Sequence, residues 1–205
     1  MIKFNKIITK VANDNHERNR FKRLEKADKN HPVIKLFRSK KIQTKKLLEI
    51  GCSTGFVLKR IKDITNANCY GIDPSRKAIS EGKKIFKGIN LYPGTLESSS
   101  LRKKKFDLII FGFFLFLLPP KKILNLFKIV DDMLDNDGKI IIYDFHAKNL
   151  IRKKYKHKKG LFSYKWNFKN VFLSLPQYKL VYLKVEKYKK TNDKLEVSLI
   201  KKKDK

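Results

Sequence analysis

The chain has 205 residues, 41% of them hydrophobic, which indicates one domain with a sizeable buried core. Its longest apolar run, 108–118, is shorter than the roughly 20 residues needed to span a bilayer, and no apolar signal segment opens the chain. The two cysteines, Cys52 and Cys69, fit neither a disulfide framework nor metal-ligand spacing. We therefore expect a cytoplasmic protein with no metal site.

The formal net charge of +31 would ordinarily suggest a nucleic-acid or anionic-membrane partner. However, only 8 of the 50 basic residues are arginine, the side chain that best reads phosphates and guanine. The lysines are spread through nearly every segment, and lysine has A/T-rich codons. Gene composition can thus produce this bias, and the charge alone predicts only salt-dependent, non-specific binding to polyanions.

Residues 1–40 are polar and basic, and we expect them to precede a domain at 41–205. Within this first segment, a helix break is expected at His31-Pro32, because the residue before proline avoids the helical region. His16, Glu17 and Arg20 lie on its polar part, either as part of a functional surface or as a solvated helix.

The stretch 46–73 is the most informative part of the chain. A short apolar run at 47–50 predicts a buried parallel strand, and a turn of small residues follows it. Apolar residues at helical spacing then begin at Phe56, and a second short strand, 69–72, ends at Asp73. The unit is thus strand, glycine turn, helix, strand, acid.

This unit has the physical properties of a nucleoside site. Glycines allow a sharp turn and close approach of a ligand, and the first N–H groups of the following helix are open. A carboxylate at the tip of the next strand can accept both hydroxyls of a ribose. Asp73 follows Gly51 by 22 residues (73 − 51), close to the roughly 20 expected of that acid.

The turn reads Glu49-x-Gly51-x-Ser53-x-Gly55 and resembles the E/D-x-G-x-G-x-G motif of class I S-adenosylmethionine-dependent methyltransferases, with Ser53 in place of the middle glycine. A dinucleotide fingerprint would need a third glycine where this chain has Phe56. The resemblance implies an α/β fold: a Rossmann-like, seven-stranded, mostly parallel sheet with an antiparallel C-terminal strand and helices on both faces. It also implies S-adenosylmethionine as cofactor, and a basic cap on the substrate side formed by residues 1–40.

The resemblance further implies a set of cofactor-binding residues at the ends of the strands. They are Glu49, Gly51, Cys52, Ser53, Gly55, Phe56, Asp73, Pro74, Gly94, Thr95, Leu96, Phe111, Gly112 and Phe113.

After Asp73, a helix is expected from Pro74, then a third strand at 89–92 and an apolar fourth strand at 106–114. Many class I methyltransferases carry an acid for the adenine amino group after the third strand, where this chain has Thr95. Methyltransferases of nucleic-acid base amines often carry an acid or Asn followed by Pro-Pro at the end of the fourth strand. This chain has Gly-Phe-Phe-Leu there, which argues against base amines as acceptors.

The remaining elements are an amphipathic helix at 121–134, a fifth strand at 140–143 and two antiparallel strands at 178–185 and 195–200. Residues 147–170 form a basic, aromatic insertion on the substrate side or a flexible loop.

The run His157-x-x-Gly-Leu-Phe-Ser-Tyr-Lys in this insertion, preceded by Tyr143-Asp144-Phe145, resembles small methyltransferases of surface-polysaccharide and sugar-modification gene sets. This second resemblance implies a small-molecule acceptor, such as a nucleotide sugar or glycan, methylated on oxygen. A hydroxyl acceptor gains from a general base, and the candidates are His157, then His146 and Asp144. Two other functions stay open: an RNA methyltransferase, favoured by the basic and aromatic stretch at 152–169, and a non-catalytic cofactor-binding protein.

Overall fold

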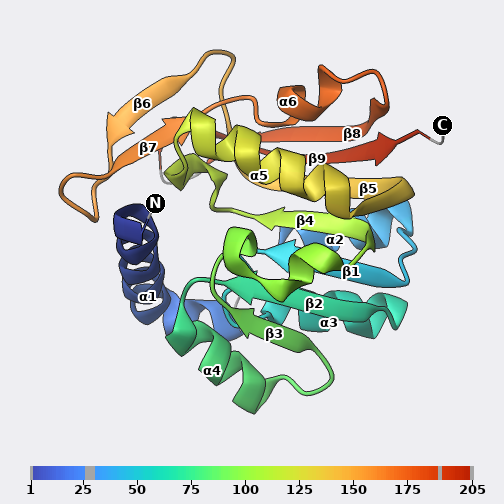
Figure 1. Cartoon of the computed structure of the whole chain (residues 1–205), viewed down its shortest axis with the longest axis horizontal. Coiled ribbons are helices and arrows are strands. Elements are labelled where there is room, and N and C mark those ends of the chain that lie inside the picture. The colour runs from blue at the N-terminus through green and yellow to red at the C-terminus, as the bar shows by residue number, and fades with distance from the viewer. Residues whose placement is uncertain (1, 26–30, 189–190, 204–205) are drawn as a thin grey trace. The chain divides into compact units, whose positions relative to one another are not determined.

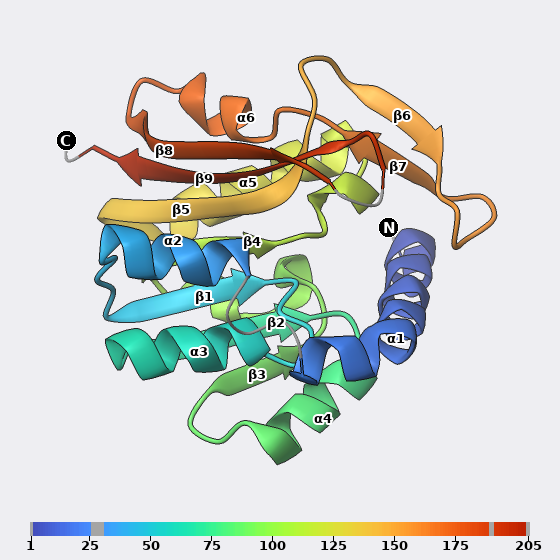
Figure 2. The same cartoon turned by 180° about the vertical axis from the view of Figure 1, so that it is seen from behind.

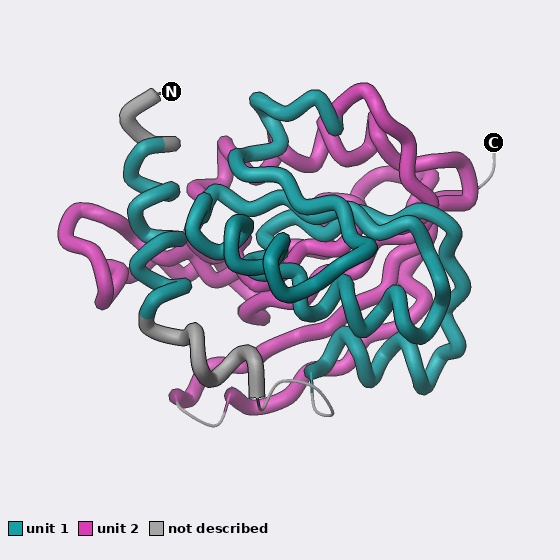
Figure 3. The backbone as a smooth tube through the Cα atoms, turned by 90° about the horizontal axis from the view of Figure 1, so that it is seen from below, with its two compact units in different colours: residues 1–101 teal, residues 102–205 magenta. Residues whose placement is uncertain are grey.

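A computed structural model describes residues 2–25, 31–188 and 191–203 (Figure 1). The side chains of residues 2–5 and 18–25 lie outside this description, and with them that of Arg20. The chain divides into two compact units, residues 1–101 and 102–205 (Figure 3). The domain boundary expected at residue 40 stays a prediction.

The described strands form a Rossmann-like, mostly parallel seven-stranded sheet in the order β3-β2-β1-β4-β5-β9-β8, with helices around it. β6 and β7 pair separately as a two-stranded sheet. This confirms the predicted fold class, including the antiparallel C-terminal strand.

The first unit contains the predicted strand–turn–helix–strand arrangement. Its elements are α1 (Ile2–Glu25), α2 (Pro32–Lys40), β1 (Lys46–Ile50), α3 (Phe56–Thr65), β2 (Asn68–Asp73), α4 (Arg76–Ile85), β3 (Asn90–Pro93) and the 3₁₀ turns η1 (Leu96–Ser98) and η2 (Ser100–Lys103), the last of which runs past residue 101. β1 pairs parallel to β2, and β2 parallel to β3. The carboxyl ends of the three strands therefore lie at one edge, where open α/β sheets bind ligands.

Helices α2 and α3 bury the apolar faces expected from their sequences. α2 begins at Pro32, and it buries Ile34, Leu36 and Phe37. α2 packs against α3, as Figure 2 shows. The apolar residues of α2 are thus part of the core.

The second unit contains the other half of the sheet. Its elements are β4 (Phe106–Gly112), η3 (Leu115–Leu117), α5 (Pro120–Met133), β5 (Leu134–His146), β6 (Ile151–Lys154), β7 (Phe162–Lys165), α6 (Lys169–Leu173), β8 (Tyr178–Lys187) and β9 (Lys194–Lys202). β5 pairs parallel to β4 and antiparallel to β9, and β9 pairs antiparallel to β8.

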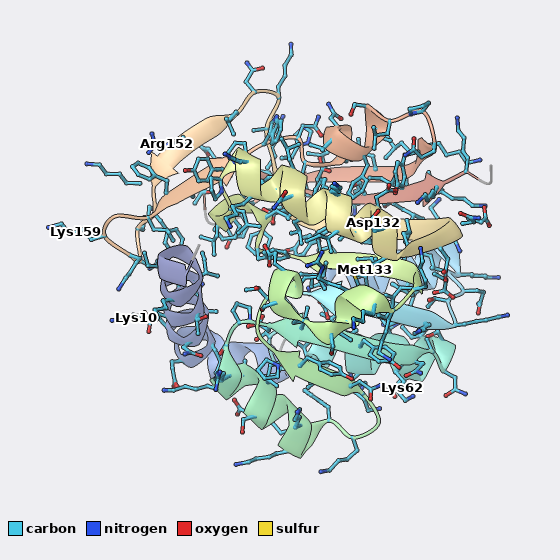
Figure 4. The ribbon with its side chains drawn as sticks, in the orientation of Figure 1. Lys10, Lys62, Asp132, Met133, Arg152 and Lys159 are labelled. Atoms are coloured by element: carbon cyan, nitrogen blue, oxygen red, sulfur yellow. The ribbon has the colours of Figure 1, made fainter. Side chains whose placement is uncertain are left out.

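Two parts of this unit have more structure than the sequence predicted. β5 is far longer than the predicted strand at 140–143: it begins at Leu134, which pairs with Phe106 of β4, and ends at His146, which pairs with Lys194 of β9. Within residues 147–170, β6 and β7 form an antiparallel hairpin, with the Arg152 guanidinium carbon 3.6 Å from the centre of the Phe162 ring. This contradicts the flexible-loop alternative, while an insertion on the substrate side stays a prediction. Figure 4 shows Arg152 and Lys159 on this hairpin.

Candidate functional site

The turn after β1 is held tightly against the tip of β2. Gly51, Ser53 and Gly55 all adopt positive φ angles of 78°, 52° and 83°. The N–H groups of Gly51 and Cys52 both donate to the Ile72 carbonyl, at 2.8 and 3.2 Å. The backbone therefore takes the left-handed path that the glycine motif predicts, and the serine in the middle position adopts it too.

The carboxylate of Asp73 explains how Ser53 is held there. Asp73 Oδ2 accepts the Ser53 N–H at 2.9 Å, and its Oδ1 accepts the Ser75 N–H at 2.8 Å. These bonds connect the tip of β2 to the glycine turn and to the start of α4. Each carboxylate oxygen can accept a second hydrogen bond, and Asp73 is 8% exposed. The acid thus orders the turn and the start of α4.

The end of β3 meets the same point. The Gly94 N–H donates to the Asp73 carbonyl at 2.9 Å, and Gly94 has a φ of 128°, which favours glycine. Thr95 precedes η1 in an extended conformation, and Leu96 is buried. The predicted residues Asp73, Pro74 and 94–96 therefore lie together at the strand tips of the first unit.

Cys52 and Glu49, also predicted at this site, are buried. Burial, with the charges of Asp73 and Glu49, raises the pKa of the Cys52 thiol well above its usual value, so the thiol is protonated near neutral pH. Glu49 lies opposite Gly71 in the β1–β2 register. A methyl group in place of the Gly71 hydrogen would stand only 2.7 Å from the Cys52 sulfur. Gly71 therefore provides room for the turn.

Two further features of this site were not predicted from the sequence. Gly82 in α4 packs so closely on the turn that a Cβ there would lie 2.1 Å from the Thr54 carbonyl oxygen. Thr54 Oγ1 is buried and has no hydrogen-bond partner among the described residues. A helix glycine at a helix–turn contact leaves no periodic signal in the sequence.

The N-terminal helix is fastened beside the tip of β2. The Ser75 hydroxyl donates to Asn13 Oδ1 at 2.8 Å, and His16 Nε2 lies 2.7 Å from Glu81 Oε2. Glu17 also forms an ion pair with α4. Asn13 thus contacts Ser75, which follows Asp73 by two residues, while the role of the N-terminal segment as a cap on the substrate side stays a prediction.

In the second unit, the predicted residues at the end of β4 have different roles. Phe111 is fully buried, and its ring packs against Phe127 at 5.0 Å, so it belongs to the core. Gly112 pairs with Tyr143, whose carbonyl accepts the Phe113 N–H at 3.1 Å. Phe113 has a φ of 56°, a conformation that is costly for a large side chain and that often marks functional sites.

Phe113 belongs to an aromatic cluster at the ends of β4 and β5. We define the aromatic cluster as Phe113, Phe116, Tyr143, Phe145, Tyr155 and Tyr188, whose neighbouring ring centres lie 5.2–6.2 Å apart. The Lys165 ammonium stands 4.6 Å from the centre of the Phe145 ring. The sequence indicates the aromatic content of these segments but does not show that they meet.

The three candidate bases differ in their surroundings. Asp144 is fully buried, and its Oδ1 and Oδ2 accept the N–H groups of Phe145 and Leu115 at 2.7 and 2.8 Å. Burial raises its pKa to about 8, although these hydrogen bonds favour the charged form. This placement makes Asp144 a support for the turn after β4 and leaves the two histidines as candidates that reach the surface.

His146 has an ordered carboxylate partner, whereas His157 is exposed on the hairpin. His146 Nδ1 lies 2.6 Å from Glu196 Oε2, and 22% of the His146 side chain is exposed. The His157 ring meets the Tyr155 ring edge-on at 5.4 Å. Of the two histidines, His146 thus has a carboxylate contact and His157 an aromatic one, and the order of the candidate bases expected from the sequence stays a prediction.

Within the described residues, no group of three or more His, Cys, Asp or Glu side chains is placed to hold a metal ion. Of the helices described, none has the length and apolar character needed to cross a membrane.

Comparison with known proteins adds a family match over part of the chain. Residues 47–138 match a family model described as a methyltransferase domain. No curated protein sequence matches the chain.

Solved structures share the fold at low sequence identity. The "DhpI-SAH complex structure" is 12% identical, covers 100% of both chains and gives a TM-score of 0.69. A 1,6-didemethyltoxoflavin-N1-methyltransferase of Burkholderia thailandensis, with its substrate and S-adenosylhomocysteine bound, is 12% identical over 95% of this chain and 88% of its own, with a TM-score of 0.68. A putative S-adenosylmethionine-dependent methyltransferase from Listeria monocytogenes is 11% identical over 84% of this chain and 99% of its own, with a TM-score of 0.65. The domain match and this shared fold support an S-adenosylmethionine-dependent methyltransferase.

Proposed function

We propose that the chain methylates an oxygen of a sugar or another small hydroxyl-bearing acceptor, such as a nucleotide sugar or glycan, by direct displacement. The observation that carries the donor half of this proposal is the placement of Asp73 at the tip of β2, bonded to the turn through Ser53. S-adenosylmethionine supplies a methyl carbon that its sulfonium has already activated.

The residues of the first unit fit the adenosine part of that donor. The Asp73 carboxylate lies at the tip of β2, where the acid that accepts ribose hydroxyls is expected, and the buried Thr54 hydroxyl has no partner among the described residues. The N–H groups of Gly51, Cys52, Ser53 and Gly55 are bonded within the protein, so the backbone donors for a polar ligand would come from the first turn of α3. Residues 94–96 would hold the adenine side and Asp73 the ribose.

The aromatic cluster of the second unit supports a small ring-shaped acceptor. Aromatic side chains with a few polar groups are typical of small-molecule sites, and here Lys165, which is ion-paired with Asp193, lies beside Phe145. Because the methyl carbon is already reactive, this chain has to orient the acceptor hydroxyl and accept its proton. His146, at the carboxyl end of β5, is the group we assign to that proton.

An RNA acceptor is the second candidate, and the β6–β7 hairpin favours it. Exposed basic side chains follow β6 and its turn, and Arg152 stacks on the Phe162 ring. Basic residues interleaved with aromatic rings can bind single strands of RNA.

A labelling screen separates these functions. We would incubate the protein with methyl-labelled S-adenosylmethionine and, in parallel, nucleotide sugars, small heteroaromatic compounds and total RNA. Label in the sugar fraction is expected, whereas label in RNA alone or in heteroaromatic compounds alone would overturn the proposed acceptor. If no fraction is labelled and calorimetry detects no binding of S-adenosylmethionine, the protein is a non-catalytic member of this fold.

A further inference from the structure

We infer that Glu196 is a positioning residue that fixes the proton of His146 on Nδ1 and so leaves Nε2 free to accept the acceptor's proton. This role rests on the proposed function, because Glu196 would act on catalysis only through His146, the proposed base. It is carried by a set of contacts among β5, β9 and α6, all within the second unit.

Glu196 is a buried carboxylate with an unusually complete set of partners. Its side chain is 0% exposed. Oε2 receives the His146 Nδ1 contact at 2.6 Å and accepts from the Lys169 ammonium at 3.1 Å, while Oε1 accepts from the Ser198 hydroxyl at 3.1 Å. A buried charge is tolerated only when it is paired and hydrogen-bonded in this way.

These partners hold the carboxylate in one place. Lys169 is itself buried and also bonds Asn167 Oδ1, so its position is determined from α6. Ser198 lies two residues along β9 from Glu196 and is fully buried. A carboxylate fixed from both sides presents one oxygen to the imidazole in a constant direction.

The contact with Glu196 sets the tautomer of His146. A carboxylate accepts hydrogen bonds, so Nδ1 must carry the proton when the neutral ring contacts it at 2.6 Å. Nε2 then holds the lone pair. Because 22% of the side chain is exposed while Glu196 is fully buried, the ring lies between the interior and the surface.

The step this arrangement serves is balanced in atoms and electrons. The acceptor hydroxyl gives its proton to Nε2 of His146 as its oxygen forms the bond to the methyl carbon. The carbon–sulfur bond of the donor breaks, and its electron pair stays on sulfur, cancelling the sulfonium charge. The negative charge of Glu196 faces the imidazolium that forms, and the proton then passes from Nε2 to water.

A structural role for the same contacts is the competing explanation, because the Lys169–Glu196 pair fastens α6 to β9. A purely structural Glu196 would lower stability and activity whether or not His146 is present. A positioning Glu196 loses its effect once His146 is gone, because coupled residues are not additive.

The test combines kinetics with nitrogen-15 NMR of histidine-labelled protein, using His146→Gln, Glu196→Gln and the double variant. We expect Glu196→Gln to lower kcat tenfold or more, with calorimetric affinity for S-adenosylmethionine unchanged within about twofold. We expect the double variant to be no slower than His146→Gln alone. Circular dichroism and thermal unfolding of each variant show whether it folds.

The NMR spectrum gives a readout that does not need an acceptor. In the wild type, the His146 signals, assigned by their loss in His146→Gln, should report a protonated Nδ1 and an unprotonated Nε2. Glu196→Gln should give a mixture of tautomers. An unprotonated Nδ1 in the wild type would overturn the inference. So would a Glu196→Gln substitution that lowers kcat by the same factor in the wild type and in His146→Gln. If no acceptor is ever labelled, the proposed function fails, while the tautomer result still decides whether Glu196 orients the ring.

Discussion

At the scale of single residues, Asp73 combines a ligand-binding role with a structural one. Its two oxygens accept the backbone N–H groups of Ser53 in the turn and Ser75 at the start of α4. Asp73→Ala leaves both N–H groups without this acceptor. We expect the affinity for S-adenosylmethionine to fall tenfold or more, through loss of hydrogen bonds to a charged group worth about 1.5–3 kcal/mol. Titration calorimetry measures this change.

The control for this substitution is Asp63→Ala in α3. Asp63 forms an exposed pair with Lys59 one helical turn away, and such surface pairs contribute about 0.3–0.5 kcal/mol. Asp63→Ala should leave donor affinity unchanged. Equal affinity in wild type and Asp73→Ala would remove Asp73 from the donor site.

Asp144 makes the stability of the protein depend on pH. Its pKa is raised from 3.8 to about 8 by burial, so the folded state keeps a proton that the unfolded state has lost. The stabilising contribution of the protonated Asp144 is therefore complete below pH 3.8, its pKa in the unfolded chain, and is lost as the pH rises through about 8, its pKa in the folded protein. The free energy of unfolding should fall by up to about 1.4 kcal/mol per pH unit across this window.

Asp144→Asn tests this effect, because asparagine cannot titrate. Urea unfolding of both proteins at several pH values between about 4 and 8 gives the difference that belongs to Asp144. We expect the difference to shift steadily with pH. Parallel profiles for the two proteins would mean that Asp144 is ionised in the folded state throughout this range.

The residues of the two units were not equally predictable. Asp73 follows the glycine turn at a spacing set by one strand–helix–strand unit, so the sequence contains its signal. His146 and Glu196 are 50 residues apart and meet only because β5 and β9 pair in one register. No local pattern records that pairing, so the sequence does not indicate that His146 has a carboxylate partner. The resemblance ranks His157 first, and the structure places that residue exposed on a hairpin.

At the scale of elements, α4 positions the glycine turn through Gly82. A Cβ at this position would lie 2.1 Å from the Thr54 carbonyl oxygen, which belongs to the backbone and cannot rotate away. Gly82→Ala should therefore displace the helix or the turn, and overpacking of this kind costs about 1–3 kcal/mol. We expect a lower denaturation midpoint together with weaker donor binding.

Ser80→Ala is the matched control, because Ser80 is exposed in the same helix. It should keep both the wild-type midpoint and the wild-type donor affinity, since alanine favours helices. A Gly82→Ala protein that unfolds like the wild type would show that α4 can move without disturbing the turn.

Elements with a strong apolar period were predictable, including the terminal strands β8 and β9, whereas the β6–β7 hairpin was not. α3 and α5 begin within one residue of their predicted starts, because apolar residues recur at helical spacing after a turn or proline. The hairpin of β6 and β7 has a basic sequence, and all of β6 is exposed, so no alternation of buried and exposed residues marked it. Its strands are defined by pairing with each other.

At the scale of the whole molecule, the charge of +31 is spread over nearly every segment and not gathered in one. The protein should bind RNA, DNA and heparin alike at low salt, and release them as salt rises, because binding depends on counterion release. Fluorescence anisotropy with a labelled RNA oligonucleotide, titrated at increasing sodium chloride, measures the slope of log affinity against log salt.

Two quadruple variants then separate a general field from a dedicated RNA surface. One replaces the exposed hairpin lysines with glutamine: Lys153, Lys154, Lys156 and Lys159. The other replaces the same number of exposed lysines elsewhere: Lys83, Lys84, Lys87 and Lys103.

If the charge acts only as a whole, both variants lose the same amount of RNA affinity, and each flattens the salt slope equally. Each phosphate contact with a single strand contributes about −0.7 to that slope, so four fewer contacts are measurable. A loss confined to the hairpin variant, with binding that persists at high salt, would instead favour RNA as the acceptor, because only a dedicated surface adds contacts that salt does not screen.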